Sequence, residues 1–135
     1  MTGHRLTLRV YYEDTDFSGL VYHASYLRFL ERGRTEMLRA AGIDQSTLHA
    51  GGEGLFFAVR RMLIDWLVPA RMDDVLTVET RTKEVRGASI LVAQRILRGD
   101  QVLMTAEVRV AALIGGRPAR LPDGLRAILE GGPEA

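Results

Sequence analysis

Two aspartates and a histidine stand close together early in the chain, in the stretch 10–23 that reads VYYEDTDFSGLVYH. Asp14 and Asp16 precede the predicted start of an amphipathic helix, and His23 lies at that start. A carboxylate beside a helix N-terminus has backbone N–H groups as neighbours, and these groups can polarise a carbonyl. One short segment could therefore supply a nucleophile or base together with an oxyanion site, which suits acyl transfer.

Each of these residues also has a purely structural interpretation. Acids before a helix are most often caps or solvated neighbours, so Asp14 and Asp16 could be such a pair, and replacing Asp14 by asparagine is expected to be mild. A single histidine is usually structural, but the position of His23 would let it orient a substrate or shuttle a proton. Tyr12 could be a half-buried aromatic residue of a strand.

The spacing of ligand residues argues against a metal site. Residues 14–19 match the opening of a calcium loop, with oxygen ligands at its positions 1, 3 and 5 and glycine at position 6. Position 12 of such a loop should be a glutamate and is Ser25, and a strand is predicted where a helix should precede the loop. The three histidines show no paired helical spacing, and cysteine is absent. We therefore predict no metal and no cofactor, and the lack of cysteine fits a reducing compartment.

Length and composition bound the partners of this chain. Its 135 residues suffice for a single domain over 1–135, and 47% of them are hydrophobic, a surplus that predicts contacts between subunits. A net charge of +1 gives no indication of a nucleic-acid partner. The N-terminal residues lack the apolar core of a signal peptide, and no run approaches the length of a membrane span. We therefore predict a cytoplasmic location.

Hydrophobic periodicity predicts the elements that position these residues. Residues 5–12 alternate as a strand, and a loop over 13–23 leads to a helix of about five turns whose apolar positions continue to Ala41. Gly42 stands where a helix cap belongs. The rest of the chain is predicted to form a loop or short helix over 44–54, four strands over about 55–68, 74–85, 88–98 and 102–114, and a last helix over 123–130.

The order of these elements predicts an α+β fold. Glycine-containing separators at 86–87, 99–100 and 115–116 are short enough for antiparallel hairpins. The economical arrangement packs the long helix against the concave face of a curved, five-stranded antiparallel sheet. Gly33, near the middle of this helix, costs about 1 kcal/mol relative to alanine, which predicts that a strand approaches the helix closely there.

Basic residues on the predicted strands could contribute to a phosphate site or could simply cover exposed faces. They are Arg60, Arg61, Lys83, Arg86 and Arg95. Taken singly, each is expected to be an exposed strand residue. The sequence has no Gly-x-Ser-x-Gly elbow, phosphate loop or dinucleotide-binding glycine pattern, so nothing indicates a nucleotide cofactor.

Several motifs together resemble the 4-hydroxybenzoyl-CoA thioesterase branch of the hotdog superfamily, and most closely the acyl-CoA thioesterases encoded with the bacterial Tol–Pal envelope system. The motifs are VYYEDTD at 10–16, GLVYHASY at 19–26, FLERGRTEML at 29–38, PARMDD at 69–74 and RGAS at 86–89. The resemblance implies a hotdog fold and hydrolysis of acyl-CoA to free acid and CoA, with CoA as part of the substrate. It also implies a homo-oligomer with the acyl site between subunits, and we expect a tetramer built as a dimer of dimers.

The resemblance also assigns roles to residues. In this family the acid that closes the D-x-D motif is catalytic, and it corresponds to Asp16, while the accompanying tyrosine and histidine correspond to Tyr12 and His23. A thiol with a pKa of about 8.5 leaves readily, so one carboxylate and an oxyanion site can suffice. Asp16 would either attack the carbonyl or deprotonate water, and both routes stay open. The oxyanion donor is expected among the backbone N–H groups of residues 22–24.

Two other functions are compatible with such a fold. A dehydratase or hydratase of acyl thioesters would carry its acid and histidine on a different part of the helix or loop. A non-catalytic module that binds acyl carrier protein or an envelope partner would not need Tyr12, Asp16 and His23 together. The sequence leaves open the acyl chain length and head group, the residues that bind the CoA phosphates, and whether acyl carrier protein is a partner.

Overall fold

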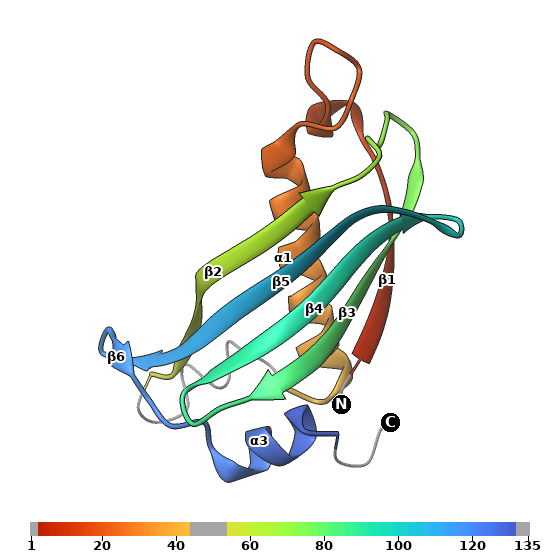
Figure 1. Ribbon diagram of the computed structural model, residues 1–135. Helices are drawn as coiled ribbons and strands as arrows, with labels where there is room; N and C mark the ends of the chain where they lie inside the picture. Colours follow the sequence, from red (N-terminus) through yellow and green to blue (C-terminus); the bar gives the residue numbers. More distant parts are fainter. Residues whose placement is uncertain (1–2, 44–53, 132–135) are drawn as a thin grey trace.

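The computed structural model describes residues 3–43 and 54–131, arranged as one sheet with two helices against it (Figure 1). The strands are β1 (Gly3–Arg9), β2 (Phe56–Trp66), β3 (Val75–Val85), β4 (Ser89–Arg98), β5 (Gln101–Ile114) and the two-residue β6 (Arg117–Pro118). The helices of the described residues are α1 (His23–Ala40), α3 (Asp123–Leu129) and the single 3-10 turn η1 (Tyr12–Asp14).

All strand pairs are antiparallel, and the order across the sheet is β1-β3-β4-β5-β2, with β6 paired to β5. The edges of the sheet are therefore β1 and β2. In Figure 1, α1 runs along the face of the sheet turned away from the viewer, and α3 lies at the lower end. This arrangement confirms the predicted α+β fold of an antiparallel sheet with a long helix, and β6 is the one strand that the prediction lacked.

The core forms where the apolar side of α1 meets the inward side chains of the strands. On β5, alternate residues from Met104 to Ala112 are buried, as expected for a strand with one covered face. Helix α1 contributes Tyr26, Phe29, Leu30, Met37 and Leu38, which recur at helical spacing. The two periodicities meet in one continuous cluster, which fixes the face of the sheet that α1 covers.

The close approach predicted at Gly33 is confirmed. A Cβ atom added there would lie 2.7 Å from Thr80 Oγ1 and 2.7 Å from Val78 Cγ1. Both residues belong to β3, and the buried Gln94 of β4 lies beside them. The side-chain amide of Gln94 donates hydrogen bonds to the Leu30 carbonyl and to Thr80 Oγ1, each 2.9 Å long. Helix and sheet are thus held together by a polar link as well as by packing.

The first predicted strand, 5–12, begins two residues after the start of β1 and extends three residues beyond its end. β1 ends at Arg9, and Tyr12 begins η1 instead of closing a strand. Val10 is fully buried and its N–H donates to the Asp74 carbonyl, while the Tyr11 N–H donates to the Asp14 carboxylate, so the chain turns away from β3 at this point. The bounds predicted for the other strands and the last helix agree within two residues, and the element predicted over 44–54 falls almost entirely outside the described residues.

Candidate active site

Asp16 begins a tight turn that ends at Gly19. The Gly19 N–H donates to the Asp16 carbonyl and the Asp16 N–H donates to the Leu20 carbonyl, each at 3.0 Å. Gly19 has a φ of +80°, a left-handed conformation that favours glycine. Thr15 and Val21 form an antiparallel bridge behind the turn. The turn therefore holds Asp16 at the end of a small two-stranded loop that leads into α1.

Ser18 fixes the carboxylate of Asp16 and keeps it charged. Both the hydroxyl and the backbone N–H of Ser18 donate to Asp16 Oδ1, the N–H at 2.8 Å, which is the geometry of an Asx turn. These hydrogen bonds, the hydroxyl first, hold the pKa of Asp16 below its usual value, and the nearby His23 adds to the effect. Asp16 is exposed, so a carboxylate that is ionised at neutral pH faces the solvent.

Asp14 points the other way and is buried. Its Oδ2 accepts the Tyr11 N–H at 2.8 Å, and its Oδ1 lies 3.3 Å from Arg28 Nη2. The Asp14 carbonyl accepts hydrogen bonds from the Tyr22 N–H and the Ser25 hydroxyl. These contacts join η1 to the first turn of α1, so Asp14 has a larger structural role than the mild one expected for a solvated neighbour of Asp16.

A segment between β2 and β3 holds the loop of Asp16 in place through backbone hydrogen bonds. The Val21 N–H donates to the Ala70 carbonyl at 2.9 Å, and Leu20 forms a bridge with Arg71. The Tyr26 hydroxyl accepts the Ala70 N–H at 2.8 Å, and burial raises the pKa of Tyr26, which keeps the phenol neutral. The PARMDD motif thus acts by positioning the loop, because it contributes backbone partners at these points.

His23 is the first residue of α1 and packs against an aromatic residue that the sequence analysis did not select. Its ring lies edge-on to the indole of Trp66, with 4.7 Å between ring centroids, and Trp66 also packs on Tyr26 at 5.0 Å. Trp66 is the last residue of β2, so this contact ties the helix entrance to the edge strand. The sequence shows Trp66 as an aromatic residue near the end of a predicted strand. This signal gives no indication that Trp66 lies against His23.

Tyr12 does not join the other two residues predicted for the site. Its side chain is 78% exposed, and its backbone carbonyl accepts hydrogen bonds from the N–H and hydroxyl of Thr15. Within residues 3–43 and 54–131, its phenol makes no hydrogen bond to Asp16 or His23. The structure thus places His23 near enough for its charge to help lower the pKa of Asp16, and it leaves the phenol of Tyr12 in solvent.

The start of α1 offers two backbone donors near Asp16. The Tyr22 N–H is already bonded to the Asp14 carbonyl, and the Ser25 N–H to the Tyr22 carbonyl. Tyr22 precedes the helix without a side-chain cap, and the N–H groups of His23 and Ala24 have no hydrogen-bond partner in the described part of the chain. Of the three N–H groups over residues 22–24 that were expected as oxyanion donors, those of His23 and Ala24 therefore remain candidates.

The charged side chains of residues 3–43 and 54–131 form ion pairs more often than clusters of like charge. The described residues contain no cluster of three or more metal-binding side chains, and none of their helices is long and apolar enough to cross a membrane. Three of the five basic strand residues form ion pairs with glutamates of the sheet. The pairs are Lys83–Glu107, Arg86–Glu84 and Arg95–Glu79. This pairing agrees with the expectation of exposed residues, although Arg86 lies in the turn between β3 and β4 and not on a strand.

Comparison with known proteins places this geometry in a family. A family model described as the thioesterase-like superfamily matches residues 10–129, from the loop of Asp16 through α3. The chain belongs to this superfamily. This thioesterase-like protein is 46% identical over 127 residues to acyl-CoA thioesterase YbgC of Haemophilus influenzae, covering 93% of each chain. It is 44% identical over 129 residues to acyl-CoA thioester hydrolase YbgC of Escherichia coli O157:H7, covering 93% of this chain and 95% of that protein.

Solved structures agree with this family assignment. A probable thioesterase from Bartonella henselae superposes with a TM-score of 0.86 at 48% identity, covering 89% of this chain and 99% of that chain. A thioesterase from Thermus thermophilus complexed with coenzyme A and Zn has a TM-score of 0.81 at 26% identity, covering 94% and 97%. The family resemblance and the hotdog fold predicted for this thioesterase-like protein are confirmed.

Proposed function

We propose that the protein hydrolyses acyl-CoA thioesters and that Asp16 is its nucleophile or general base. The observation that carries this proposal is an ionised, exposed carboxylate held by Ser18 beside the open N-terminus of α1. Homologues that are themselves acyl-CoA thioesterases, similar over nearly the whole chain, support the same reaction. They do not favour a dehydratase or a non-catalytic binding module.

The chemistry follows from two groups on this loop and helix. The N–H groups of His23 and Ala24 would receive the oxyanion that forms when the thioester carbonyl is attacked. In one route a carboxylate oxygen of Asp16 bonds to the carbonyl carbon, the C–S bond breaks, CoA leaves as thiolate, and water then cleaves the anhydride. In the other route Asp16 takes a proton from water, the water oxygen bonds to the carbonyl carbon, and the same C–S bond breaks.

Tyr12 is proposed to contact the substrate from the solvent side of this site. Its phenol is exposed, and so are the side chains of Tyr11, Phe17 and Tyr22 on the same loop. Aromatic residues with one apolar face and one polar end are suited to line a site that a ligand or a second subunit completes. The role of Tyr12 as the third site residue thus depends on what covers this loop.

The edge strand β2 supports the proposal of a homo-oligomer. Among the described residues, only one side of β2 is paired, and its exposed side chains include Val59, Leu63 and Trp66. An exposed edge with apolar side chains is a ready site for pairing with a second chain. We propose that two copies join through β2 and that two such dimers form the tetramer. The cytoplasmic location stays a prediction from the sequence.

We expect the purified protein to be a homo-oligomer. Light scattering at micromolar concentration should give a mass several times the 15.0 kDa of one chain. The reason is that a stable monomer would leave the apolar edge and the aromatic loop in water. A stable monomer of 15.0 kDa would contradict the proposed assembly.

The function itself is tested with a panel of aliphatic and aromatic acyl-CoAs, read by release of free thiol. We expect release from at least one class of substrate, and we expect the rate to survive exhaustive treatment with EDTA, because neither proposed route uses a metal. A dehydratase would change the acyl chain without releasing thiol, and a binding module would do neither. Loss of turnover with EDTA, restored by a divalent ion, would overturn the mechanism.

The His23→Ala variant should lose less activity than a variant without the Asp16 carboxylate. A thiolate with a conjugate-acid pKa of about 8.5 needs little protonation to leave, so the imidazole would orient the substrate or assist in proton transfer. Its backbone N–H is retained in the variant. Steady-state kinetics of the two variants on one substrate make the comparison. Equal losses in kcat would instead make the imidazole a full partner in the chemistry.

A further inference from the structure

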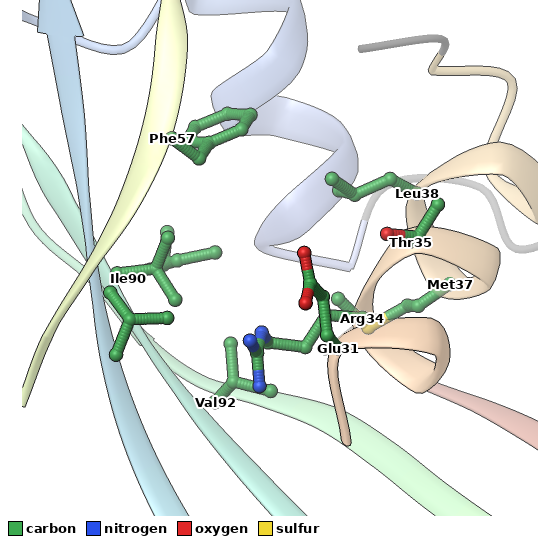
Figure 2. A pocket seen from close by; sticks show the side chains of 10 residues that line it. Glu31, Arg34, Thr35, Met37, Leu38, Phe57, Ile90 and Val92 are labelled. Atoms are coloured by element: carbon green, nitrogen blue, oxygen red, sulfur yellow. The ribbon is translucent and has the colours of Figure 1, made fainter. Parts of the chain in front are cut away.

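A cavity of about 220 Å³ lies between the second half of α1 and the strands β2, β4 and β5 (Figure 2). Its strand side is apolar and includes Phe57, Ile90 and Val92. Its helix side carries two charged residues, Glu31 and Arg34, and the guanidinium of Arg34 points toward the strands in Figure 2. Neither Asp16 nor His23 lines this cavity, so it is separate from the groups proposed to react.

Arg34 is held in a fixed position on the helix side of this cavity. Its side chain is only partly exposed, and its Nη1 donates to Gln94 Oε1 at 3.0 Å. Because the amide nitrogen of Gln94 already donates to the Leu30 carbonyl and Thr80 Oγ1, its oxygen is oriented toward the guanidinium. Burial lowers the pKa of Arg34, yet a guanidinium stays charged in proteins. Gln94 therefore presents a cation to the cavity.

Arg34 forms no direct ion pair in the described part of the chain, and the negative charge that acts on it is that of Glu31, three residues earlier on α1. Its hydrogen-bond partner Gln94 is neutral. Glu31 also lines the cavity, but it is exposed, so solvent screens its charge more strongly. A guanidinium presents five N–H donors in a planar fork that matches a carboxylate. The interior of the cavity thus favours a ligand that brings a carboxylate.

The proposed dimer would bring this cavity to the reacting groups. Phe57, near the start of β2, lines the cavity, whereas Trp66, at the end of β2, packs on His23. Antiparallel pairing of two β2 edges places the end of the strand in one copy beside its start in the other. The helix entrance of one copy would then lie beside the cavity of the other, so an acyl chain could extend from Asp16 into that cavity.

We propose that Arg34 selects acyl-CoA substrates whose acyl chain ends in a carboxylate. The apolar walls would hold the methylene groups, and the guanidinium would bind the terminal carboxylate through paired hydrogen bonds. Gln94 is the positioning residue of this site. The inference rests on the proposed acyl-CoA hydrolysis and adds the substrate class to it.

The test uses pairs of acyl-CoAs of equal chain length, one ending in a carboxylate and one in a methyl group, over a series of lengths. At the length that reaches Arg34, wild-type protein should show the higher kcat/KM for the carboxylate-ended substrate. Arg34→Met keeps a long side chain and removes the charge, so it should lower kcat/KM for that substrate at least about tenfold, mainly through KM, as expected for a charged hydrogen bond. The methyl-ended substrate should be hydrolysed as well or better.

Arg32→Met is the matched control, because Arg32 lies on the same helix, is exposed and does not line the cavity. It should leave the preference unchanged, and Arg34→Lys, which keeps the charge without the fork, should retain part of it. Equal treatment of both substrates by the wild type would overturn the inference, even if Arg34→Met fails to fold. The inference would also fail if Arg34→Met lowered kcat/KM equally for both substrates and dissociated the oligomer. That result would show that a second copy fills the cavity. If neither substrate releases thiol, the proposed function fails instead.

Discussion

Asp16→Asn should abolish thioester hydrolysis, with kcat at least about a hundredfold lower, because removing a general base or nucleophile has an effect of this size. The amide has nearly the same shape as the carboxylate, but it can neither attack a carbonyl nor take a proton from water. Asp16 is exposed and its side chain hydrogen-bonds within its own turn, to Ser18, so the melting temperature should stay unchanged. Thiol-release kinetics and thermal unfolding of the same preparation give both measurements.

Substrate binding is the control for this variant. An inactive Asp16→Asn protein should still bind acyl-CoA, since the amide removes no apolar contact and the N–H groups of His23 and Ala24 are retained. If the melting temperature and the activity both fell, Asp16 would have a capping role. Retention of most of the activity would refute the proposed mechanism.

The two routes open to Asp16 can be separated in oxygen-18 water, with wild-type enzyme in excess over substrate for one turnover. If Asp16 forms an anhydride and water attacks the aspartyl carbon, one labelled oxygen remains in the Asp16 carboxylate. If water attacks the acyl carbon, in either route, the label appears only in the product acid. Label in Asp16, detected by mass spectrometry of the peptide, would establish the covalent route.

Asp14→Ala should lower the free energy of unfolding by about 2 kcal/mol, because it leaves a partly buried backbone donor without its acceptor and removes an ion pair of the buried carboxylate. The donor is the Tyr11 N–H, and the lost ion pair is that with Arg28, whose side chain is half exposed. In a chain of this size the change corresponds to a melting temperature lower by roughly 6–8 °C. Thermal and denaturant unfolding measure it.

Glu13→Ala is the matched control for Asp14→Ala, since Glu13 is the neighbouring acid of η1 and is exposed. It should change stability by less than about 0.5 kcal/mol. The contrast with Asp16 is the sharper test, because one aspartate of the D-x-D motif should affect stability and the other turnover. An Asp14→Ala protein as stable as the wild type would show that the loop does not depend on this buried carboxylate.

Much of the fold could be predicted from local sequence patterns. Alternation of apolar residues located the strands, helical spacing located α1, and Gly33 correctly indicated a close approach of helix and sheet. These features are local, since the face that a residue presents follows from the period of its own segment. The motif around Asp16 likewise predicted the family, because residue types and spacing in one segment carry that information.

The tertiary structure alone decided which groups meet. Val10 bonds to Asp74 just beyond the end of β1, and His23 packs on Trp66, contacts that join segments far apart in the chain. The burial of Asp14 and the exposure of Asp16 depend on how the loop docks on residues 67–74. Because both residues are aspartates of one motif, the sequence does not indicate which of them is buried. The link between Arg34 and Gln94, 60 residues apart, depends on the register of β4 under α1. Such contacts arise from strand pairing and helix docking, which the periodicity of a single segment does not encode.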